Sequence, residues 1–322
     1  MSAQSSNRMS RQLALHGVVP VITTPFVSET EEVDFDALKQ LVDFAVAIGS
    51  SGICLNGYMS EFHKLSESER FRIVEVAVQQ ANGRVAVIAQ SYHPFAQSAQ
   101  ENARRNEALG VDLISFTIPR IYTLGTEEVF DYCEAICRAV NVPVLIRDRN
   151  PGGPTVGPEF CQRLHETCPN FCYLKLEEPL MFRVGPKISA IQEVTEGEVG
   201  VLEGRSGLYV LDLLPYGICG SMPGLGVADV LTHVWQLGKQ HRLDEAMDVF
   251  QHIAPHLIFG LQDMGLFLHL EKRLLVARGL LKQATDRRIT SSLSPELLTY
   301  GDFLNRRVLK LVADLKLDQS RL

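Results

Sequence analysis

The chain has 322 residues, of which 46% are hydrophobic and 21% are charged, a composition typical of a soluble globular protein with one large domain and an appendage. Its longest apolar runs are strand-sized and residues 1–11 are polar, so neither a membrane span nor a signal peptide is predicted, and we expect a cytoplasmic protein. A net charge of −7 argues against a non-specific nucleic-acid binder. The seven cysteines have neither a CxxC motif nor metal-ligand spacing, so we expect reduced thiols and no metal.

Strand-like and helix-like runs alternate along most of the chain. After an N-terminal segment that we expect to be flexible (residues 1–16), a strand is predicted at 17–26, and Asp34 is the expected N-cap of a helix at 35–48. Further strands are predicted at 52–56, 84–90, 111–118, 142–146, 171–176, 199–203 and 217–220, and helices at 66–80, 95–109, 127–140, 158–167 and 187–194. Beyond residue 240 the strand signal stops, and helices are predicted at 243–260, 266–282 and 295–315.

This alternation predicts a fold of parallel βαβ units, because short apolar strands suit a sheet that is covered on both faces. Eight units in the first 240 residues match a (β/α)8 TIM barrel, which typically has roughly 250 residues. A doubly wound open sheet is disfavoured, since neither a GxGxxG motif nor a P-loop follows the first strand. We therefore predict a barrel over residues 17–240 and a helical C-terminal region over 241–322, which packs on the barrel or on a neighbouring subunit.

The apolar run at residues 171–178 contains a lysine, Lys175, in its middle. Burial disfavours the charged ammonium, so a lysine on a buried strand tends to become a neutral amine, which is a nucleophile suited to Schiff-base chemistry. The alternative is that Lys175 reaches water from the strand's end or pairs with Glu177 or Glu178. Both interpretations stay open from this segment alone.

In a barrel, functional residues are expected where the strands end and in the loops that follow them. The candidate positions for binding or catalysis are Tyr58, Met59 and Ser60 after the second strand, Arg120 and Tyr122 after the fourth, Arg147 after the fifth, Lys175 and Glu177 on the sixth, Glu203 and Arg205 after the seventh, and Ser221 after the eighth.

Strand residues two apart share a face, so Glu177 lies on the same face as Lys175, and Arg147 on the adjacent strand is expected beside them. A guanidinium lowers the pKa of a neighbouring amine and can hold a carboxylate with two parallel hydrogen bonds. Both effects favour attack on a 2-keto acid. The alternative is that Arg147 bridges Asp148 or Glu177 in a polar rim.

The sequence resembles the dihydrodipicolinate synthase / N-acetylneuraminate lyase family from about residue 17 to residue 315. The order and spacing of several segments carry the resemblance: GVVPVITTPF (17–26), the run at 35–57, RVAVIAQ (84–90), ALGVDLISFTIP (108–119), VPVLI (142–146), YLKLEE (173–178) and GICGSMPG (217–224). The resemblance implies a (β/α)8 barrel with C-terminal helices, a homodimer or homotetramer, and a Schiff base between Lys175 and a small 2-keto acid, without a cofactor.

The sequence departs from the family pattern at several site positions. The family's glycine-threonine-threonine-glycine-glutamate stretch, which holds the keto acid's carboxylate, is replaced by residues 57–61, where only Ser60 or the backbone remains to serve. Arg147 stands where the family has a proton-relaying tyrosine, and arginine does not titrate in the working range. The candidates for proton transfer are therefore Glu177, ranked first, Tyr122 and His93, although Glu177 is equally compatible with a salt bridge to Arg147 or Lys175.

Two functions remain as hypotheses. The first is a lyase, either an aldolase or a hydro-lyase of 2-keto-3-deoxy sugar acids, that acts through Lys175. Charge and bulk at Tyr58, Arg120, Arg147 and Arg205 then indicate a second acidic or polyhydroxylated group on the substrate, which argues against the lysine-pathway synthase. The second is a non-catalytic member that binds a keto acid or sugar acid, which the missing tyrosine and threonines favour.

Overall fold

The computed structural model describes residues 15–121, 123–287 and 293–317, and within them eight parallel strands form one sheet in the order β1-β8-β7-β6-β5-β4-β3-β2. The strands are β1 (Gly17–Val18), β2 (Gly52–Leu55), β3 (Ala86–Gln90), β4 (Leu113–Thr117), β5 (Val144–Arg149), β6 (Phe171–Glu177), β7 (Gly200–Glu203) and β8 (Gly220–Ser221). The chain after β1 closes the sheet on β2, because Ile22 N donates to Cys54 O and Cys54 N donates to Pro20 O, each at 2.9 Å. The predicted barrel is confirmed.

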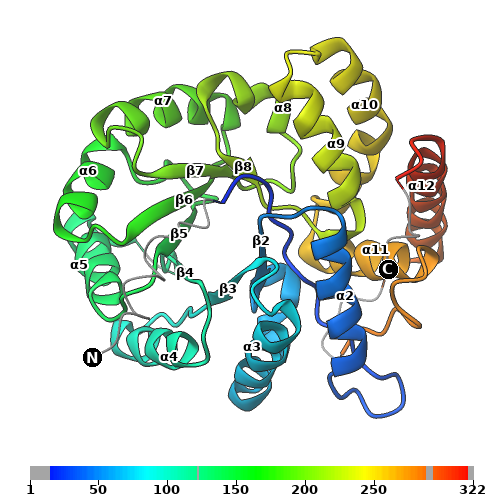
Figure 1. The fold of residues 1–322 in the computed structure, drawn as a ribbon, viewed down its shortest axis with the longest axis horizontal. Coiled ribbons are helices and arrows are strands. Elements are labelled where there is room, and N and C mark those ends of the chain that lie inside the picture. Colours follow the sequence, from blue (N-terminus) through cyan, green and yellow to red (C-terminus); the bar gives the residue numbers. More distant parts are fainter. Residues whose placement is uncertain (1–14, 122, 288–292, 318–322) are drawn as a thin grey trace.

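Helices surround the barrel, and the C-terminal helices lie together on one side of it (Figure 1). The surrounding helices are α2 (Phe35–Ala47), α3 (Glu67–Ala81), α4 (Ala96–Ala108), α5 (Thr126–Cys137), α6 (Pro158–Thr167), α7 (Val184–Val194), α8 (Val210–Leu213) and α9 (Ala228–Lys239), followed by α10 (Leu243–Gly260), α11 (Met264–Ala277) and α12 (Pro295–Asp314). Asp34 caps α2 as expected, accepting a hydrogen bond from Ala37 N at 2.9 Å. None of the helices in the described ranges is long and apolar enough to cross a membrane.

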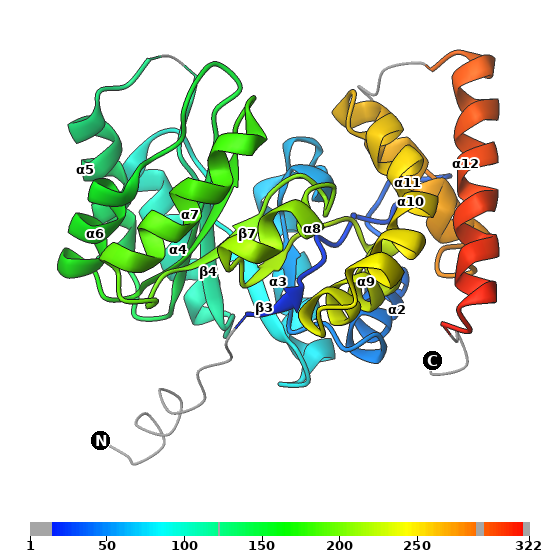
Figure 2. The same cartoon turned by 90° about the horizontal axis from the view of Figure 1, so that it is seen from above.

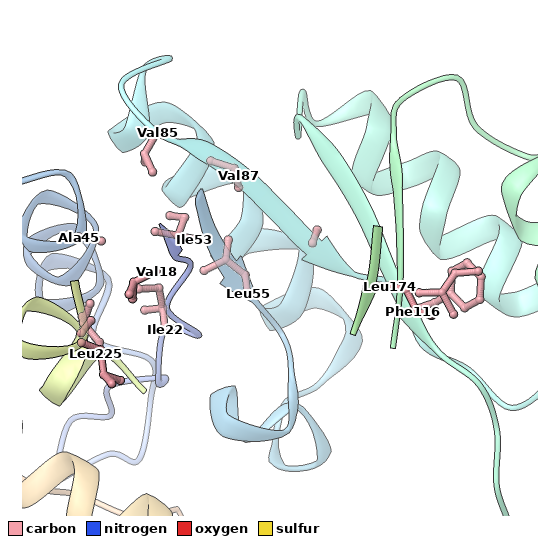
Figure 3. Close-up of a cluster of buried hydrophobic side chains, with 14 of the residues drawn as sticks. Val18, Ile22, Ala45, Ile53, Leu55, Val85, Val87, Phe116, Leu174 and Leu225 are labelled. Carbon is pink, nitrogen blue, oxygen red and sulfur yellow. The ribbon is translucent and has the colours of Figure 1, made fainter. Parts of the chain in front are cut away.

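Two hydrophobic clusters account for the apolar strands. The larger cluster fills the space between the strands and the surrounding helices and includes Leu174 and Leu176 of β6; Figure 3 shows part of it. The smaller cluster lies inside the barrel and includes Leu145 of β5 and Leu202 of β7. Because both faces of each strand are buried, the strands read as continuous apolar runs rather than as alternating ones.

Several elements differ in length from the prediction. Strand β1 covers Gly17–Val18 instead of the predicted residues 17–26, and two further differences have an identifiable cause. Strand β5 continues to Arg149, three residues beyond the predicted end, because its charged residues find partners: Arg147 is in register with Lys175, and Arg149 with Glu177. Helix α11 ends at Ala277 rather than at residue 282, since Gly279 has a φ of +73°, a left-handed conformation that does not continue a helix.

The C-terminal helices pack on the barrel. Phe267 and Leu268 of α11 belong to the cluster inside the barrel, and Arg278 donates to Asp229 Oδ1 of α9 at 2.8 Å. Helix α12 lies on the outer side of α10 and α11 (Figure 2), and Asn305 of α12 is 3.1 Å from the ring of His256 of α10. Of the two packing alternatives for these helices, the one on the barrel is therefore realised within the chain, and it places α11 against the functional end of the strands.

Candidate active site

Lys175 is buried inside the barrel. Its side chain lies between β5 and β7, where Arg147 and Leu202 are its register partners, and the residue is 4% exposed. Burial lowers the pKa of Lys175, because an apolar environment disfavours the ammonium. The charge of Arg147 lowers this pKa further, while the carboxylate of Glu177 opposes the shift. The amine is thus more easily obtained in its neutral, nucleophilic form than that of an exposed lysine.

Glu177 and Arg147 form a buried ion pair beside this amine. Arg147 Nε and Nη2 donate to Glu177 Oε1 and Oε2 at 2.6 and 2.9 Å, and Oε1 is 3.6 Å from Lys175 Nζ. Burial by itself would raise the pKa of Glu177, but the charges of Arg147 and Lys175 outweigh it and hold this pKa below its ordinary value. The bridge between Arg147 and Glu177, one of the two alternatives in the sequence, is therefore present, and two of the guanidinium's donors already have an acceptor.

The turn after β2 contributes one aromatic side chain to the same group. Tyr58 and Met59 belong to the short 3-10 turn η1 (Tyr58–Ser60), and both line the cavity above Lys175. The Tyr58 ring stacks on Arg147, with the guanidinium carbon 4.5 Å from the ring centroid. Ser60, in contrast, turns away from the cavity, because its hydroxyl donates to Ile22 O at 2.6 Å. The hydroxyl that the sequence offered for anion binding is therefore already in use.

The cavity has a volume of about 270 Å³ and opens between the barrel and the turn that joins α10 to α11. Its apolar lining includes Val21, Cys54, Leu145, Met222 and Phe267. Its polar lining includes Gln90, Ser115, Arg149, Glu177, Arg205, Gln262 and Asp263. A small acid in this cavity would thus meet the amine of Lys175 together with apolar side chains and arginines.

Three other predicted positions lie outside the cavity lining, and a fourth, Tyr122, is not among the described residues. Arg120 holds Asp148 through two hydrogen bonds of 3.1 and 2.8 Å, and it does not line the cavity. Ser221 is fully buried between β1 and β7, also outside the cavity lining. Glu203 supports the loop after β7, as described below. For Arg120 the contacts indicate a structural role rather than contact with a substrate, whereas the buried hydroxyl of Ser221 has no hydrogen-bond partner among the described residues.

Glu203 accepts hydrogen bonds from Arg205 N at 2.7 Å and from Gly207 N at 2.6 Å, and it is 1% exposed. Burial raises the pKa of Glu203 to about 7, although these two donors oppose the shift. The carboxylate therefore shapes the loop that carries Arg205, and it stays behind the cavity wall rather than in it.

Arg149 is a cavity residue that the sequence analysis missed. Its Nε lies 3.5 Å from Glu177 Oε2, and its side chain is 46% exposed at the mouth. The signal was present in the spacing: Arg149 is two residues beyond Arg147 and so shares its face, provided that the strand continues. The predicted strand ended at residue 146, and residues 147–150 were assigned to the loop that follows it.

A second buried ion pair joins the turn η1 to α11. Glu61, which ends η1 with a φ of +57°, pairs with Lys272 and accepts a hydrogen bond from Lys64 at 2.7 Å. Glu61 and Lys272 are 0% and 1% exposed, and Lys272 also donates to Thr285 O at 2.8 Å. The C-terminal region thereby holds the turn that carries Tyr58 and Met59.

The sequence of the chain matches that of a known protein family. Residues 14–225 match the sequence profile of the Dihydrodipicolinate synthetase family. The chain belongs to this family. The resemblance read from the sequence is therefore confirmed, although residues 57–61 and Arg147 depart from the family pattern described above.

Two relatives by sequence and one solved structure show what this chain is similar to. An L-2-keto-3-deoxyarabonate dehydratase of Azospirillum brasilense is 24% identical over 243 residues, which are 74% of this chain and 77% of that relative. An N-acetylneuraminate lyase of Citrobacter koseri is 30% identical over 133 residues, 41% of this chain and 44% of that relative. The crystal structure of dihydrodipicolinate synthase from Rhodopseudomonas palustris has a TM-score of 0.82 at 22% identity, and the match covers 91% of this chain and 97% of that one. Relatives named as lyases and dehydratases support an enzyme.

Proposed function

We propose that this protein is a lyase that forms a Schiff base between Lys175 and a small 2-keto acid. The observation that supports the proposal is the buried Lys175, whose pKa is lowered and whose side chain lines the cavity, in a family with relatives named as lyases and dehydratases. Whether the natural reaction cleaves a C–C bond or removes water is set by the substrate rather than by the amine, since both reactions use the same iminium.

In the proposed mechanism, neutral Lys175 Nζ adds to the C2 carbonyl. The adduct takes up one proton and loses one water, which gives a protonated imine between Nζ and C2. The imine then accepts the electron pair that is released when a C3–H proton leaves or when the C3–C4 bond breaks, and it becomes an enamine. In dehydration, the enamine expels the C4 hydroxyl group, which takes up a proton and leaves as water. In cleavage, the C4 hydroxyl group loses its proton as the C3–C4 bond breaks and C4 leaves as a carbonyl, and the enamine then takes up a proton at C3. Hydrolysis of the product imine regenerates the amine. The apolar side chains that line the cavity limit the access of water and so favour the neutral amine before attack.

Glu177 is the proposed acid and base of this site. It is the titratable group placed nearest to the reacting nitrogen by the described contacts, with Oε1 3.6 Å from Nζ. Arg147 cannot transfer the proton, because a guanidinium stays charged. Its two hydrogen bonds to Glu177 instead hold the carboxylate in place, so Arg147 is a positioning residue, and the sequence hypothesis that it binds the substrate's carboxylate gives way to this role.

The test is intact-protein mass spectrometry after incubation with pyruvate and borohydride, followed by peptide mapping. We expect one reduced adduct, on the peptide that carries Lys175. If the adduct forms on another lysine, or if neither pyruvate nor a larger 2-keto acid gives an adduct, the proposed function is wrong.

A binding protein without turnover is the second candidate. The specific observation in its favour is that Arg147 and Ser60 donate hydrogen bonds to protein acceptors. Arg147 donates to Glu177 through Nε and Nη2, and the hydroxyl of Ser60 donates to Ile22 O. Proton NMR in D₂O separates the two candidates. A lyase exchanges the C3 protons of the bound keto acid for deuterium through its enamine, whereas a binder forms at most the adduct and leaves these protons in place.

The pH dependence of adduct formation reports the two charges beside Lys175. The rate rises with pH through the pKa of the amine and is level above it, because the ammonium form does not react. Glu177→Gln removes a charge that raises this pKa, so we expect the midpoint to move to lower pH; Arg147→Met removes one that lowers it, so the midpoint moves to higher pH. Each shift is expected to be on the order of one pH unit. Shifts in the same direction would contradict the arrangement.

A further inference from the structure

Arg205 differs from the other cavity arginines because its side chain has no hydrogen-bond acceptor among the residues that the structure describes. Arg147 and Arg149 both contact Glu177, whereas Arg205 forms no ion pair with any residue in the described ranges. Its Nε is buried and lacks a hydrogen-bond partner there. A buried guanidinium N–H without an acceptor is unfavourable, so the cavity that Arg205 lines is expected to receive one.

The loop holds Arg205 firmly in this position. Its backbone N donates to Glu203 Oε1 at 2.7 Å, and the following residue, Ser206, has a left-handed φ of +57°. A side chain on Gly204 would place its Cβ 2.5 Å from Glu177 Cγ and 2.6 Å from Leu176 O, so the loop lies directly on β6. The backbone that carries Arg205 is therefore already in place before an anion binds.

The charges around the cavity do not balance. Its lining contains four basic side chains (Lys175, Arg147, Arg149, Arg205) and two acidic ones (Glu177, Asp263), an excess of two positive charges when Lys175 or its imine is protonated. Asp263 is further occupied as the cap of α11, where it accepts hydrogen bonds from Gly265 N and Leu266 N at 2.8 and 3.1 Å. A 2-keto acid with one carboxylate compensates half of this excess, and a 2-keto diacid compensates all of it.

The cavity arginines differ in their position relative to Lys175, so they would meet different ends of such a substrate. Arg147 is in register with Lys175, and Arg149 is two residues, about 6.6 Å, further toward the mouth at the usual strand rise. On the other side of β6, Arg205 follows the end of β7, past Leu202, which is the β7 partner of Lys175. When the C2 carbon of an extended substrate is bonded to Lys175, the far end of the substrate therefore lies between Arg149 and Arg205.

We propose that the substrate is a 2-keto acid with a second carboxylate at its far end, and that Arg205 is the residue that binds this carboxylate and selects for it. This inference rests on the proposed function, because it takes the keto carbon to be bonded to Lys175. The exposed Arg149 lies near the same end of the substrate, but it already forms an ion pair with Glu177. Arg205 is therefore the specificity-determining residue.

The test compares two five-carbon 2-keto acids that differ at C5: 2-oxoglutarate, with a carboxylate there, and 2-oxopentanoate, with a methyl group. The readout is the initial rate of borohydride-trapped adduct formation at limiting acid concentration. In the wild-type protein we expect the diacid to react about 10- to 100-fold faster, the range for a charge-assisted hydrogen bond. In Arg205→Met this ratio falls to about one, and Arg205→Lys recovers part of it, since lysine keeps the charge but not the two-pronged geometry.

Arg138→Met is the matched control, because Arg138 is an exposed arginine that pairs with Glu134 far from the cavity, and it should keep the wild-type ratio. The inference is overturned if the wild-type ratio is near one, or if Arg205→Met slows both acids equally. A second readout does not need the Schiff base: glutarate should raise the Tm of the wild-type protein more than that of Arg205→Met. If no 2-keto acid labels Lys175 but this difference persists, the proposed function fails while the anion site stands; if the difference is absent too, both fail.

Discussion

We expect Lys175→Met to abolish the borohydride-trapped adduct and to lower the rate of C3 proton exchange by at least about 10⁴-fold. Loss of a covalent nucleophile typically has an effect of this size. Methionine is chosen because it has a similar volume and leaves no cavity in the buried strand. Glu177 keeps Arg147 as its partner in this variant, so no buried charge is left unpaired. We therefore expect the free energy of unfolding to change by less than about 1.5 kcal/mol.

Two controls make this result specific to the amine. Lys175→Arg keeps a positive charge but provides no nucleophile, so it should be as inactive as Lys175→Met. Lys272 is a second deeply buried lysine, and it does not line the cavity. Its peptide should remain unlabelled in the wild-type protein. Exchange that survives in both Lys175 variants would show that the reaction does not pass through this amine.

Lys272→Met is expected to destabilise the protein by roughly 3 kcal/mol, because the buried carboxylate of Glu61 loses its ion pair with Lys272 and keeps the one with Lys64. The measurement is the urea unfolding curve of the variant against the wild type. A shift of the midpoint at unchanged slope reports the loss of stability. The effect is large because Glu61 and Lys272 are buried, and a buried carboxylate that loses one of its cationic partners is costly.

The double variant Glu61→Gln/Lys272→Met distinguishes an ion pair from loose packing. If the cost comes from the buried carboxylate that has lost Lys272, the double variant recovers part of the stability lost in Lys272→Met. Losses that simply add would contradict the pairing. Arg72→Met is a matched control, because Arg72 pairs with Glu75 at the surface and should change the stability by less than about 1 kcal/mol.

Much of the barrel could be predicted from short stretches of sequence. The strand that carries Lys175 reads as a buried strand because its neighbours Leu174 and Leu176 are apolar, and the structure places both in the cluster beneath the helices. Asp34 marks the start of α2 because its carboxylate caps the first turn. These signals are local: the period of the apolar residues and the capping side chains depend on neighbours within one or two turns.

The arrangement of charges inside the barrel depended on the tertiary structure. The sequence left Arg147 with Asp148, Glu177 or a substrate as its partner, and the fold places Glu177 within 2.6 Å of it while Asp148 pairs with Arg120. It also ended the fifth strand before Arg149, which joins the sheet because β6 offers it a register partner. Partner choice of this kind is decided by desolvation and by contacts between distant segments, which no local pattern encodes.

The sequence by itself thus determined the fold class, the family and the lysine on the sixth strand, since periodicity and segment order are properties of the chain. The tertiary structure decided which side chains share the cavity with that lysine. The hydroxyl of Ser60 donates a hydrogen bond to Ile22 O. Glu61 forms an ion pair with Lys272, a residue more than two hundred positions away. Arg205 has no ion-pair partner within the described part of the chain, and it lines the same cavity as the amine. These pairings follow from closure of the barrel and docking of α11, which bring together residues whose charges must be compensated once water is excluded.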